Sequence, residues 1–458
     1  MVEGDCGENT LGIADMGMLD RRSATLGLIG ALAAGSAHAQ PRRRATPAEP
    51  DVVIVGAGSA GLAAAKELQR LGRTCLILEA SSRIGGRAWT DTTTFGAPFD
   101  HGCAWLHAAD RNPYRALADQ YGFQLSPHDY ALDRIHLGAR RVSDAEVAAL
   151  HRAETEMSDA IVEGARHLDA PASQFVDMRG PWADTAATYL GAMDFAVDLD
   201  ELSTKDYAAG EDLEPNMLCR QGFGAIVARY GVGAPVRLNA PVSAIKYGGA
   251  GVELVTPAGT VRAKKVIVTA STGVLSSGAI RWDPVLPDWK EQSFHDLPMG
   301  LLVKMPLLIR TERFGVAPFT DLFLERAGRN DIYFLSFPFN LPLMIGFVGG
   351  DFGWEMSAAG QAAGVDYARQ ALVDLFGSSA AAKVSGGLMT GWAGNKWTRG
   401  AYSAAAPGHF SARAALARPV ADRIFFAGEA LGGPLVQTCA GAFNAGQEAA
   451  RAAHAALV

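Results

Sequence analysis

The hydrophobic pattern predicts strands alternating with a helix directly after residue 50. Residues 51–55 and 74–78 are short apolar runs bounded by turn signals, which is typical of buried strands. Between them, residues 60–71 repeat apolar positions with helical spacing and end at Gly72. A strand, a helix and a second strand in this order predict a β-α-β unit at the start of a parallel sheet.

The middle of the chain mixes long helical patterns with short strands. A helix is predicted across residues 144–167, because Ser143 can cap it and acids occupy its first turn. Short strands separated by turns are predicted across residues 236–269. Another helix is predicted across residues 361–376, ended by Gly377.

Residues 332–348 are so apolar that a membrane span has to be considered. Pro338, Asn340 and Pro342 interrupt the run, so it predicts two strands instead. The chain then closes with a strand across residues 423–426, a loop, and a helix across 439–453.

Length and composition set broad limits. The chain has 458 residues, enough for two to three domain equivalents at about 150 residues each. Hydrophobic residues make up 49% and charged residues 19%, which indicates a globular protein and not a disordered one. The formal net charge of -7 argues against a nucleic-acid partner, because such a partner requires a basic face.

Residues 1–39 have the order of an export signal: a basic pair, a short apolar run and a small-x-small cleavage site. These parts are Arg21-Arg22, residues 24–34 and Ala37-His38-Ala39. The paired arginines predict twin-arginine export to the periplasm or the medium, with Met18 as the true start. Residues 40–50 are basic and Pro-rich and form a predicted linker.

After cleavage, four cysteines would remain: Cys75, Cys103, Cys219 and Cys439. Their spacing matches no disulfide framework, so no structural disulfide is expected. Cys75 lies in an apolar run, and we expect it to be a packed thiol.

The turn after the first strand has G-x-G-x-x-G spacing. Gly56 permits a tight turn, Gly58 lets the backbone approach a pyrophosphate, and Gly61 permits close packing of helix and strand. Glu79 ends the second strand, where a carboxylate can accept hydrogen bonds from ribose hydroxyls. These residues predict dinucleotide binding and leave NAD and FAD open.

The segment Arg83-Ile84-Gly85-Gly86-Arg87 follows at once, and together with the glycine loop it resembles the flavin amine oxidase family. The W-L-H and N-P pairs within residues 105–113 resemble its polyamine oxidase-like branch most. Further family-like motifs follow in the family's order: Asp100 to His107, Pro241 to Ile245, residues 272–290, Phe425 to Glu429 and Thr438 to Ala442.

This resemblance implies an α/β FAD-binding Rossmann-like domain that is discontinuous, and an α+β substrate-binding domain with a mixed sheet flanked by helices. The FAD-binding domain would comprise residues 51–125, 220–285 and 392–458, and the substrate-binding domain residues 126–219 and 286–391. Besides the glycines and Glu79, the cofactor-binding residues that the resemblance implies are Ser59, Ala60, Arg87, Gly102, Cys103, Ala104, Trp105, Val242, Glu429 and Thr438.

Lys304 lies in the apolar stretch of residues 300–307, so a strand there would bury its ammonium group. In the family, the lysine of this motif holds a water against flavin N5. The stretch from Trp392 to Ser403 also resembles a family motif. It implies that Tyr402 forms an aromatic wall beside the flavin, with Trp397 in the same site. His107 would line the substrate entrance or serve as a structural histidine.

Ala401 stands where monoamine oxidases carry the cysteine that binds FAD covalently, so non-covalent FAD is expected. Thr438 stands at their second aromatic wall, which leaves room for a longer amine. His101 and His107 lack further ligands, so no metal site is predicted.

The resemblance implies oxidation of a primary or secondary, polyamine-like amine. Hydride would pass to flavin N5, the imine would be hydrolysed, and O2 would be reduced to H2O2. The expected partners are therefore a small-molecule amine and O2, without nucleic acid or membrane insertion. The alternatives are an L-amino-acid oxidase, a pigment or porphyrinogen dehydrogenase, and a flavin-binding protein without turnover.

Overall fold

The first β-α-β unit forms as its hydrophobic pattern predicts. The computed structural model describes residues 49–129, 134–137, 139–211, 213–325 and 331–458. Strand β1 (Val52–Val55), helix α1 (Ser59–Arg70) and strand β2 (Cys75–Leu78) follow one another directly. Every residue of both strands is buried, which explains why both read as continuous apolar runs.

These strands belong to a five-stranded parallel sheet of order β10-β2-β1-β14-β23. Its other members are β10 (Val236–Arg237), β14 (Lys265–Val268) and β23 (Ile424–Phe426). The sheet thus joins the first folded residues of the chain to its last strand, as the predicted discontinuous domain requires.

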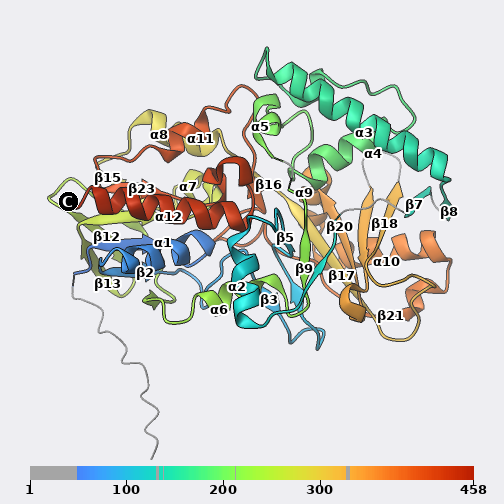
Figure 1. The fold of residues 1–458 in the computed structure, drawn as a ribbon, viewed down its shortest axis with the longest axis horizontal. Coiled ribbons are helices and arrows are strands. Elements are labelled where there is room, and N and C mark those ends of the chain that lie inside the picture. The colour runs from blue at the N-terminus through green and yellow to red at the C-terminus, as the bar shows by residue number, and fades with distance from the viewer. Residues whose placement is uncertain (1–48, 130–133, 138, 212, 326–330) are drawn as a thin grey trace, which may run out of the picture. The chain divides into compact units, whose positions relative to one another are not determined.

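Helix α12 (Cys439–Ala455) lies beside α1, although the two come from opposite ends of the chain (Figure 1). The helices pack closely because Gly446 faces the backbone of α1. A Cβ atom at Gly446 would stand 2.1 Å from the carbonyl oxygen of Ala60. This contact brings the N-termini of both helices to the same end of the sheet.

A four-stranded sheet of order β13-β12-β11-β15 shares a hydrophobic core with the parallel sheet. Its strands are β11 (Ala244–Lys246), β12 (Val252–Thr256), β13 (Gly259–Ala263) and β15 (Arg281–Asp283). The prediction of short strands across residues 236–269 is therefore confirmed. The helices of this region are α6 (Phe223–Tyr230), α7 (Thr272–Ser276), α8 (Asp288–His295) and α11 (Ala412–Ala417).

The largest sheet has seven strands in the order β21-β17-β20-β19-β18-β7-β8. Their bounds are β7 (Arg134–Leu137), β8 (Arg140–Arg141), β17 (Leu302–Ile309), β18 (Thr320–Glu325), β19 (Ile332–Ser336), β20 (Leu343–Gly349) and β21 (Val384–Gly387). The pair β7 and β18 is parallel and the other pairs are antiparallel, so the sheet is mixed. Strands β19 and β20 confirm that the apolar run of residues 332–348 forms two strands.

Helix α3 (Asp144–Ala165) is the longest helix around this sheet. Ser143 and Glu146 form a reciprocal capping box at its start, which confirms Ser143 as its cap. The neighbouring helices are α4 (Ala183–Thr188), the π-helical turn η2 (Tyr189–Met193), α5 (Thr204–Ala209), α9 (Gly350–Ala359) and α10 (Gln361–Phe376). Among the described helices, none combines the length and the apolar character that crossing a bilayer requires.

Short strand pairs connect the two large sheets. They are β3 (Thr90–Asp91) with β4 (Phe99–Asp100), β5 (Trp105–Leu106) and β6 (Leu125–Pro127) with β9 (Met217–Cys219), and β16 (Met299–Gly300) with β22 (Tyr402–Ser403). Helix α2 (Pro113–Tyr121) follows β5. The predicted division into two domains remains a prediction, and the segments it names supply the strands of the two large sheets.

Candidate active site

One cavity of about 820 Å³ runs from the end of β1 to the helices beside the seven-stranded sheet. With the exception of Gly61, every residue predicted for cofactor or substrate lines it. These are Gly56, Gly58, Ser59, Ala60, Glu79, Arg87, Gly102, Cys103, Ala104, Trp105, His107, Val242, Lys304, Trp397, Tyr402, Glu429 and Thr438. The folding of the chain therefore gathers motifs that are far apart in the sequence.

The glycine loop occupies the first end of the cavity. Gly56 has φ +102°, a conformation that favours glycine, and Gly58 is the N-cap of α1. A Cβ atom at Gly61 would stand 1.9 Å from the carbonyl oxygen of Gly56, so Gly61 serves the packing of helix against strand. The free N–H groups of α1 remain directed at the cavity, where a pyrophosphate can bind them.

Glu79 follows β2 beside this loop and is buried. Its carboxylate accepts hydrogen bonds from the backbone N–H of Ala57 at 2.6 Å and of Ser81 at 2.8 Å. The Ser81 hydroxyl donates a further bond at 2.8 Å. These bonds fix the carboxylate at the cavity wall, where its remaining lone pairs can accept from a ribose.

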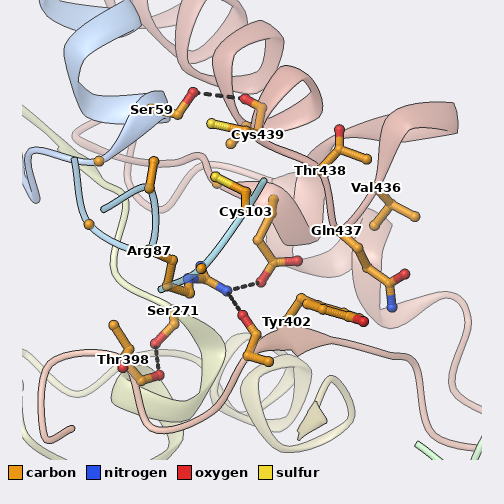
Figure 2. Close-up of a pocket in the computed structure, with 18 of the residues that line it drawn as sticks. Ser59, Arg87, Cys103, Ser271, Thr398, Tyr402, Val436, Gln437, Thr438 and Cys439 are labelled. Carbon is orange, nitrogen blue, oxygen red and sulfur yellow. Dashed lines mark hydrogen bonds and ion pairs between the residues drawn. The ribbon is translucent and has the colours of Figure 1, made fainter. Parts of the chain in front are cut away.

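Arg87 crosses the middle of the cavity. Its Nη1 donates to the carbonyl oxygen of Ala401 at 2.7 Å and to the Glu429 carboxylate at 3.0 Å (Figure 2). Glu429 also accepts from the hydroxyl of Ser403 at 3.0 Å. Arg87, Ala401 and Glu429 thus form one bonded group from three separate motifs.

Lys304 lies on β17 and is buried, as its apolar neighbours in the sequence predict. Its ammonium group donates to the carbonyl oxygens of Asp100, at 3.0 Å, and Gly102. Burial lowers the pKa of Lys304 to about 8, and the charge of Asp100 opposes this shift. The amine is therefore placed in the cavity with a pKa near neutral pH, which suits a group that exchanges or orients protons.

Aromatic side chains surround the same part of the cavity. The Tyr402 hydroxyl donates to the carbonyl oxygen of Met193 at 3.2 Å, which fixes its ring at the wall. Trp392 is buried and its indole N–H donates to the carbonyl oxygen of His101 at 2.8 Å. Asn395 accepts from the backbone N–H of Trp397 at 3.0 Å, so it forms the turn for which the family pattern uses Asp-Pro.

His107 and Trp105 lie beyond Lys304. His107 Nδ1 is 2.7 Å from the Asn216 side-chain oxygen, and burial lowers its pKa, so His107 is both hydrogen-bonded and cavity-lining. The Trp105 indole N–H donates to His128 at 3.2 Å, and His128 pairs with Asp321 at 3.4 Å. The sequence does not indicate His128 or Asp321, because neither belongs to a motif and they meet only in the folded chain, where β6 and β18 belong to different sheets.

Two acids occupy the far end of the cavity. Asp194 follows the π-helical turn and its side chain is exposed to the cavity, while the surrounding protein and nearby Glu154 raise its pKa to about 7. Glu154 lies on α3 and pairs with His151 at 3.0 Å, while its other oxygen is buried without a hydrogen-bond partner. No sequence pattern points to either acid, since an acid on or next to a helix is ordinarily solvated.

Thr438 is the N-cap of α12, and its hydroxyl accepts a hydrogen bond from the backbone N–H of Gly441 at 2.9 Å. The same hydroxyl donates to the carbonyl oxygen of Leu435 at 2.7 Å. Cys439 and Cys103 lie beside it in the cavity, while Cys75 is buried and confirmed as a packed thiol. All four described cysteines are free thiols. In the described part of the chain, no cluster of three or more His, Cys, Asp or Glu residues could hold a metal ion.

The residues present fit a flavin dinucleotide. The glycine loop at the N-terminus of α1 suits a pyrophosphate, and the buried carboxylate of Glu79 suits a ribose. A Cβ atom at Gly102 would stand 1.8 Å from the Arg87 carbonyl oxygen, so the lack of a side chain there lets segment 101–105 lie against the loop of Arg87. The same cavity continues from the glycine loop to a part lined by aromatic side chains and the buried Lys304. A fold and a site of this kind define a flavoprotein oxidoreductase.

Residues 59–454 match the family described as flavin containing amine oxidoreductase, and the chain belongs to that family. It is 27% identical to Polyamine oxidase 4 of Oryza sativa, with 89% of each chain covered. It is 24% identical to human Lysine-specific histone demethylase 2, which covers 86% of this chain. The chain spans about half, 52%, of that relative's length.

Solved structures show the same fold. Putrescine oxidase bound to putrescine has a TM-score of 0.76 and 22% identity, covering 89% of this chain and 99% of that one. Cyclohexylamine oxidase from Brevibacterium oxydans has a TM-score of 0.74 and 22% identity, with the same coverage. The resemblance to the flavin amine oxidases is therefore confirmed at the level of family and fold.

Proposed function

We propose that this chain is an FAD-dependent amine oxidase that acts on polyamine-like primary or secondary amines. The observation that carries the proposal is the continuity of one cavity from the glycine loop, past Lys304 and Tyr402, to the acids Asp194 and Glu154. A cofactor and a cationic chain can then be bound end to end in one continuous cavity.

When bound, FAD supplies the acceptor for a hydride from the amine's α-carbon and passes the electrons to O2, giving H2O2. The residues that would hold it are the glycine loop, Glu79, Arg87 and Glu429. Helix α12 would direct its N-terminal dipole at the cofactor, since Cys439 at its first turn lines the cavity. Ala401 offers no thiol for attachment, which supports non-covalent binding.

The chain's own residues orient the amine and exclude water. Tyr402 is fixed by Met193 and forms an aromatic wall, against which an amine chain can be held. Lys304 is held by two backbone carbonyls and retains a third proton that can hold a water in the cavity. That water can hydrolyse the imine to an aldehyde, with release of ammonia from a primary amine or of a shorter amine from a secondary one.

The acids at the far end favour a substrate with a second positive charge. Asp194 faces the cavity and Glu154 keeps one carboxylate oxygen without a partner. A carboxylate that faces a cavity within the protein is stabilised by a cation, and a diamine or polyamine supplies one. The named solved neighbour that binds putrescine agrees with this substrate class.

An L-amino-acid oxidase would need a cation for the substrate carboxylate. Among the described residues, the arginines that line the cavity are Arg83 and Arg87, and Arg87 is already paired with Glu429. The end where the substrate would bind carries acids instead. The geometry therefore favours an amine without a carboxylate.

The proposal is tested by mixing FAD-loaded protein anaerobically with putrescine, spermidine, an n-alkylamine and L-amino acids, and following the loss of yellow absorbance. We expect the diamine and polyamine to bleach the flavin fastest, with H2O2 released when air is admitted. Activity should rise on the alkaline side, because the reacting amine must be neutral. Bleaching by amino acids alone, or by none of these compounds, would contradict the proposal.

We also propose export through the signal of residues 1–39, which lies outside the described residues. The supporting observation is the order of Arg21-Arg22, an apolar run and a small-x-small site. Replacing both arginines by lysine should leave the protein in the cytoplasm of a bacterial host. N-terminal sequencing of exported protein would then show whether cleavage follows Ala39.

A further inference from the structure

Two cysteines from opposite ends of the folded chain meet in the cofactor cavity. Cys103 lies between β4 and β5, and Cys439 is the first residue of α12. A thiol–thiol hydrogen bond is the largest influence on the pKa of each of these two side chains. Figure 2 shows the two sulfur atoms beside each other, between Ser59 and Arg87. A bond between these two sulfurs would join the segment between β4 and β5 to the first turn of α12.

The two thiols are chemically unequal. The hydrogen bond from Cys103 lowers the pKa of Cys439, and the hydroxyls of Ser59 and Tyr114 and the charge of Arg87 act in the same direction. The same contact, together with burial, raises the pKa of Cys103. Cys439 also lies at a helix N-terminus, where the dipole stabilises a thiolate. Cys439 is therefore the more nucleophilic sulfur, and Cys103 is the resolving thiol.

Cys103 and Cys439 are also more accessible to small molecules than the other two described cysteines. Cys103 and Cys439 are half-buried and line the cavity, so a small molecule inside the cavity can reach them. Cys75 and Cys219 are buried and outside the cavity lining, and burial raises the pKa of both to about 12. These two thiols provide internal controls, because neither accessibility nor acidity favours their reaction.

We propose that Cys103 and Cys439 are a peroxide-reactive thiol pair that closes to a disulfide when FAD does not fill the cavity. The Cys439 thiolate attacks one peroxide oxygen, the O–O bond breaks, and the departing oxygen takes a proton and leaves as water. Cys439 is then a sulfenic acid. The Cys103 sulfur attacks it, the S–O bond breaks, and the hydroxyl leaves as water with the Cys103 proton. Two electrons pass from the sulfurs to the peroxide.

The disulfide would fasten segment 101–105 to the N-terminus of α12, and both line the FAD cavity. Bound FAD would cover the thiols, since the residues around them are those that fit the cofactor: Ser59, Arg87 and Gly102. The oxidation state of the two cysteines would therefore depend on whether FAD occupies the cavity. This dependence on FAD rests on the proposed function, whereas the disulfide itself does not.

The test uses the full chain, freed of FAD, reduced, desalted and then treated with H2O2. Peptide mass spectrometry should show the Cys103 and Cys439 peptides joined, with the loss of two hydrogens, while Cys75 and Cys219 remain free thiols. Cys103→Ser should instead trap a sulfenic acid at Cys439, detectable with dimedone. Cys439→Ser should leave Cys103 unreactive.

FAD at ten times its Kd should slow the disulfide about tenfold, because about one tenth of the chains are then empty. Free thiols at both positions after peroxide treatment of the wild-type chain, which requires no variant to fold, would overturn the thiol pair. An unchanged rate with bound FAD would overturn the dependence on the cofactor. The linkage is mapped without amine or FAD, so a failure of amine oxidation would contradict only the proposed function.

Discussion

Arg87 and Glu429 form an ion pair of 3.0 Å between two motifs at opposite ends of the chain, and both side chains are largely covered by protein. Glu429 also accepts a hydrogen bond from the hydroxyl of Ser403. The pair therefore ties the loop after β2 to the segment after β23, across the place where a dinucleotide would lie. If the Glu429 carboxylate were removed, the Arg87 guanidinium would remain in the cavity with no anion to pair with.

Glu429→Gln should lower the free energy of unfolding by about 3 kcal/mol, because a mostly buried charge loses its partner. It should also weaken FAD binding, since Arg87 would no longer be held in place. Urea unfolding and a flavin titration measure the two effects. The control is Glu253→Gln, whose exposed pair with Arg262 should contribute less than about 1 kcal/mol. Equal losses in both variants would contradict this account of the pair.

Gly446→Ala should destabilise the protein by about 2 kcal/mol, because the added methyl group forces α12 away from α1. The new Cβ would meet the Ala60 carbonyl oxygen at 2.1 Å. Gly249→Ala is the matched control, since nothing lies within 4 Å of a Cβ atom there. Urea unfolding of the two variants, side by side, checks the prediction. A tolerated alanine at position 446 would show that the helices separate easily.

Acid precipitation should release the flavin, leaving a colourless pellet and a yellow supernatant. The reason is that Ala401, which contributes its carbonyl oxygen to Arg87, has no nucleophilic side chain. Chromatography of the supernatant should identify FAD and no shorter flavin. Colour that stays with the precipitated chain would show a covalent bond and disprove this prediction.

The elements that the sequence predicts well are those whose signals are local. The β-α-β unit, the capping box at Ser143 and the end of α10 at Gly377 depend on residues within a few positions of one another. The small sheets could not be predicted, because the register of Trp105 against Leu218 depends on the completed fold. The same holds for the π-helical turn before Asp194.

The residues of the candidate site also separate into those with a local sequence signal and those that only the completed fold brings together. The glycine loop and Arg87 belong to recognisable motifs, and Lys304 stands out as a charge within an apolar strand. Asp194 and Glu154 give no such signal, because only the completed fold brings α3 and the residue after η2 to the same cavity. Local motifs therefore indicate the cofactor end of the cavity together with Lys304 and Tyr402, whereas the two acids become apparent only in the folded chain.

Lys304→Met should change how stability depends on pH. The folded pKa of Lys304 is about 8, below the ordinary value of 10.5. Between these two values the unfolded chain binds more protons, so the lysine's contribution to stability rises as pH rises from about 8 to 10.5. The free energy of unfolding of wild type minus that of Lys304→Met should therefore increase over this range. A constant difference would contradict a buried, deprotonating lysine.

The carboxylate of Asp194 should also cost stability where it is ionised. Burial and the charge of Glu154 raise its pKa to about 7 from 3.8, so folding becomes less favourable as pH rises through this window. Asp194→Asn should therefore raise the melting temperature of substrate-free protein at pH 8 and have little effect at pH 4. Thermal unfolding at both values checks this, and a variant that is less stable at pH 8 would contradict it.

The ionisation of Asp194 should also change the preference of the enzyme for a diamine over an n-alkylamine. Asp194 must be ionised to attract a second ammonium, so kcat/KM for a diamine should rise relative to an n-alkylamine as pH increases from 6 to 8. Both substrates must lose a proton from the reacting amine, so this pH dependence cancels in the ratio of the two kcat/KM values. Glu154, His151, Tyr207 and Tyr402 also face this part of the cavity. Asp194→Asn should make the ratio lower and nearly independent of pH, whereas Asp366→Asn, at an exposed position on α10, should leave it unchanged. A rising ratio in Asp194→Asn would assign the diamine preference to Glu154 or another group instead.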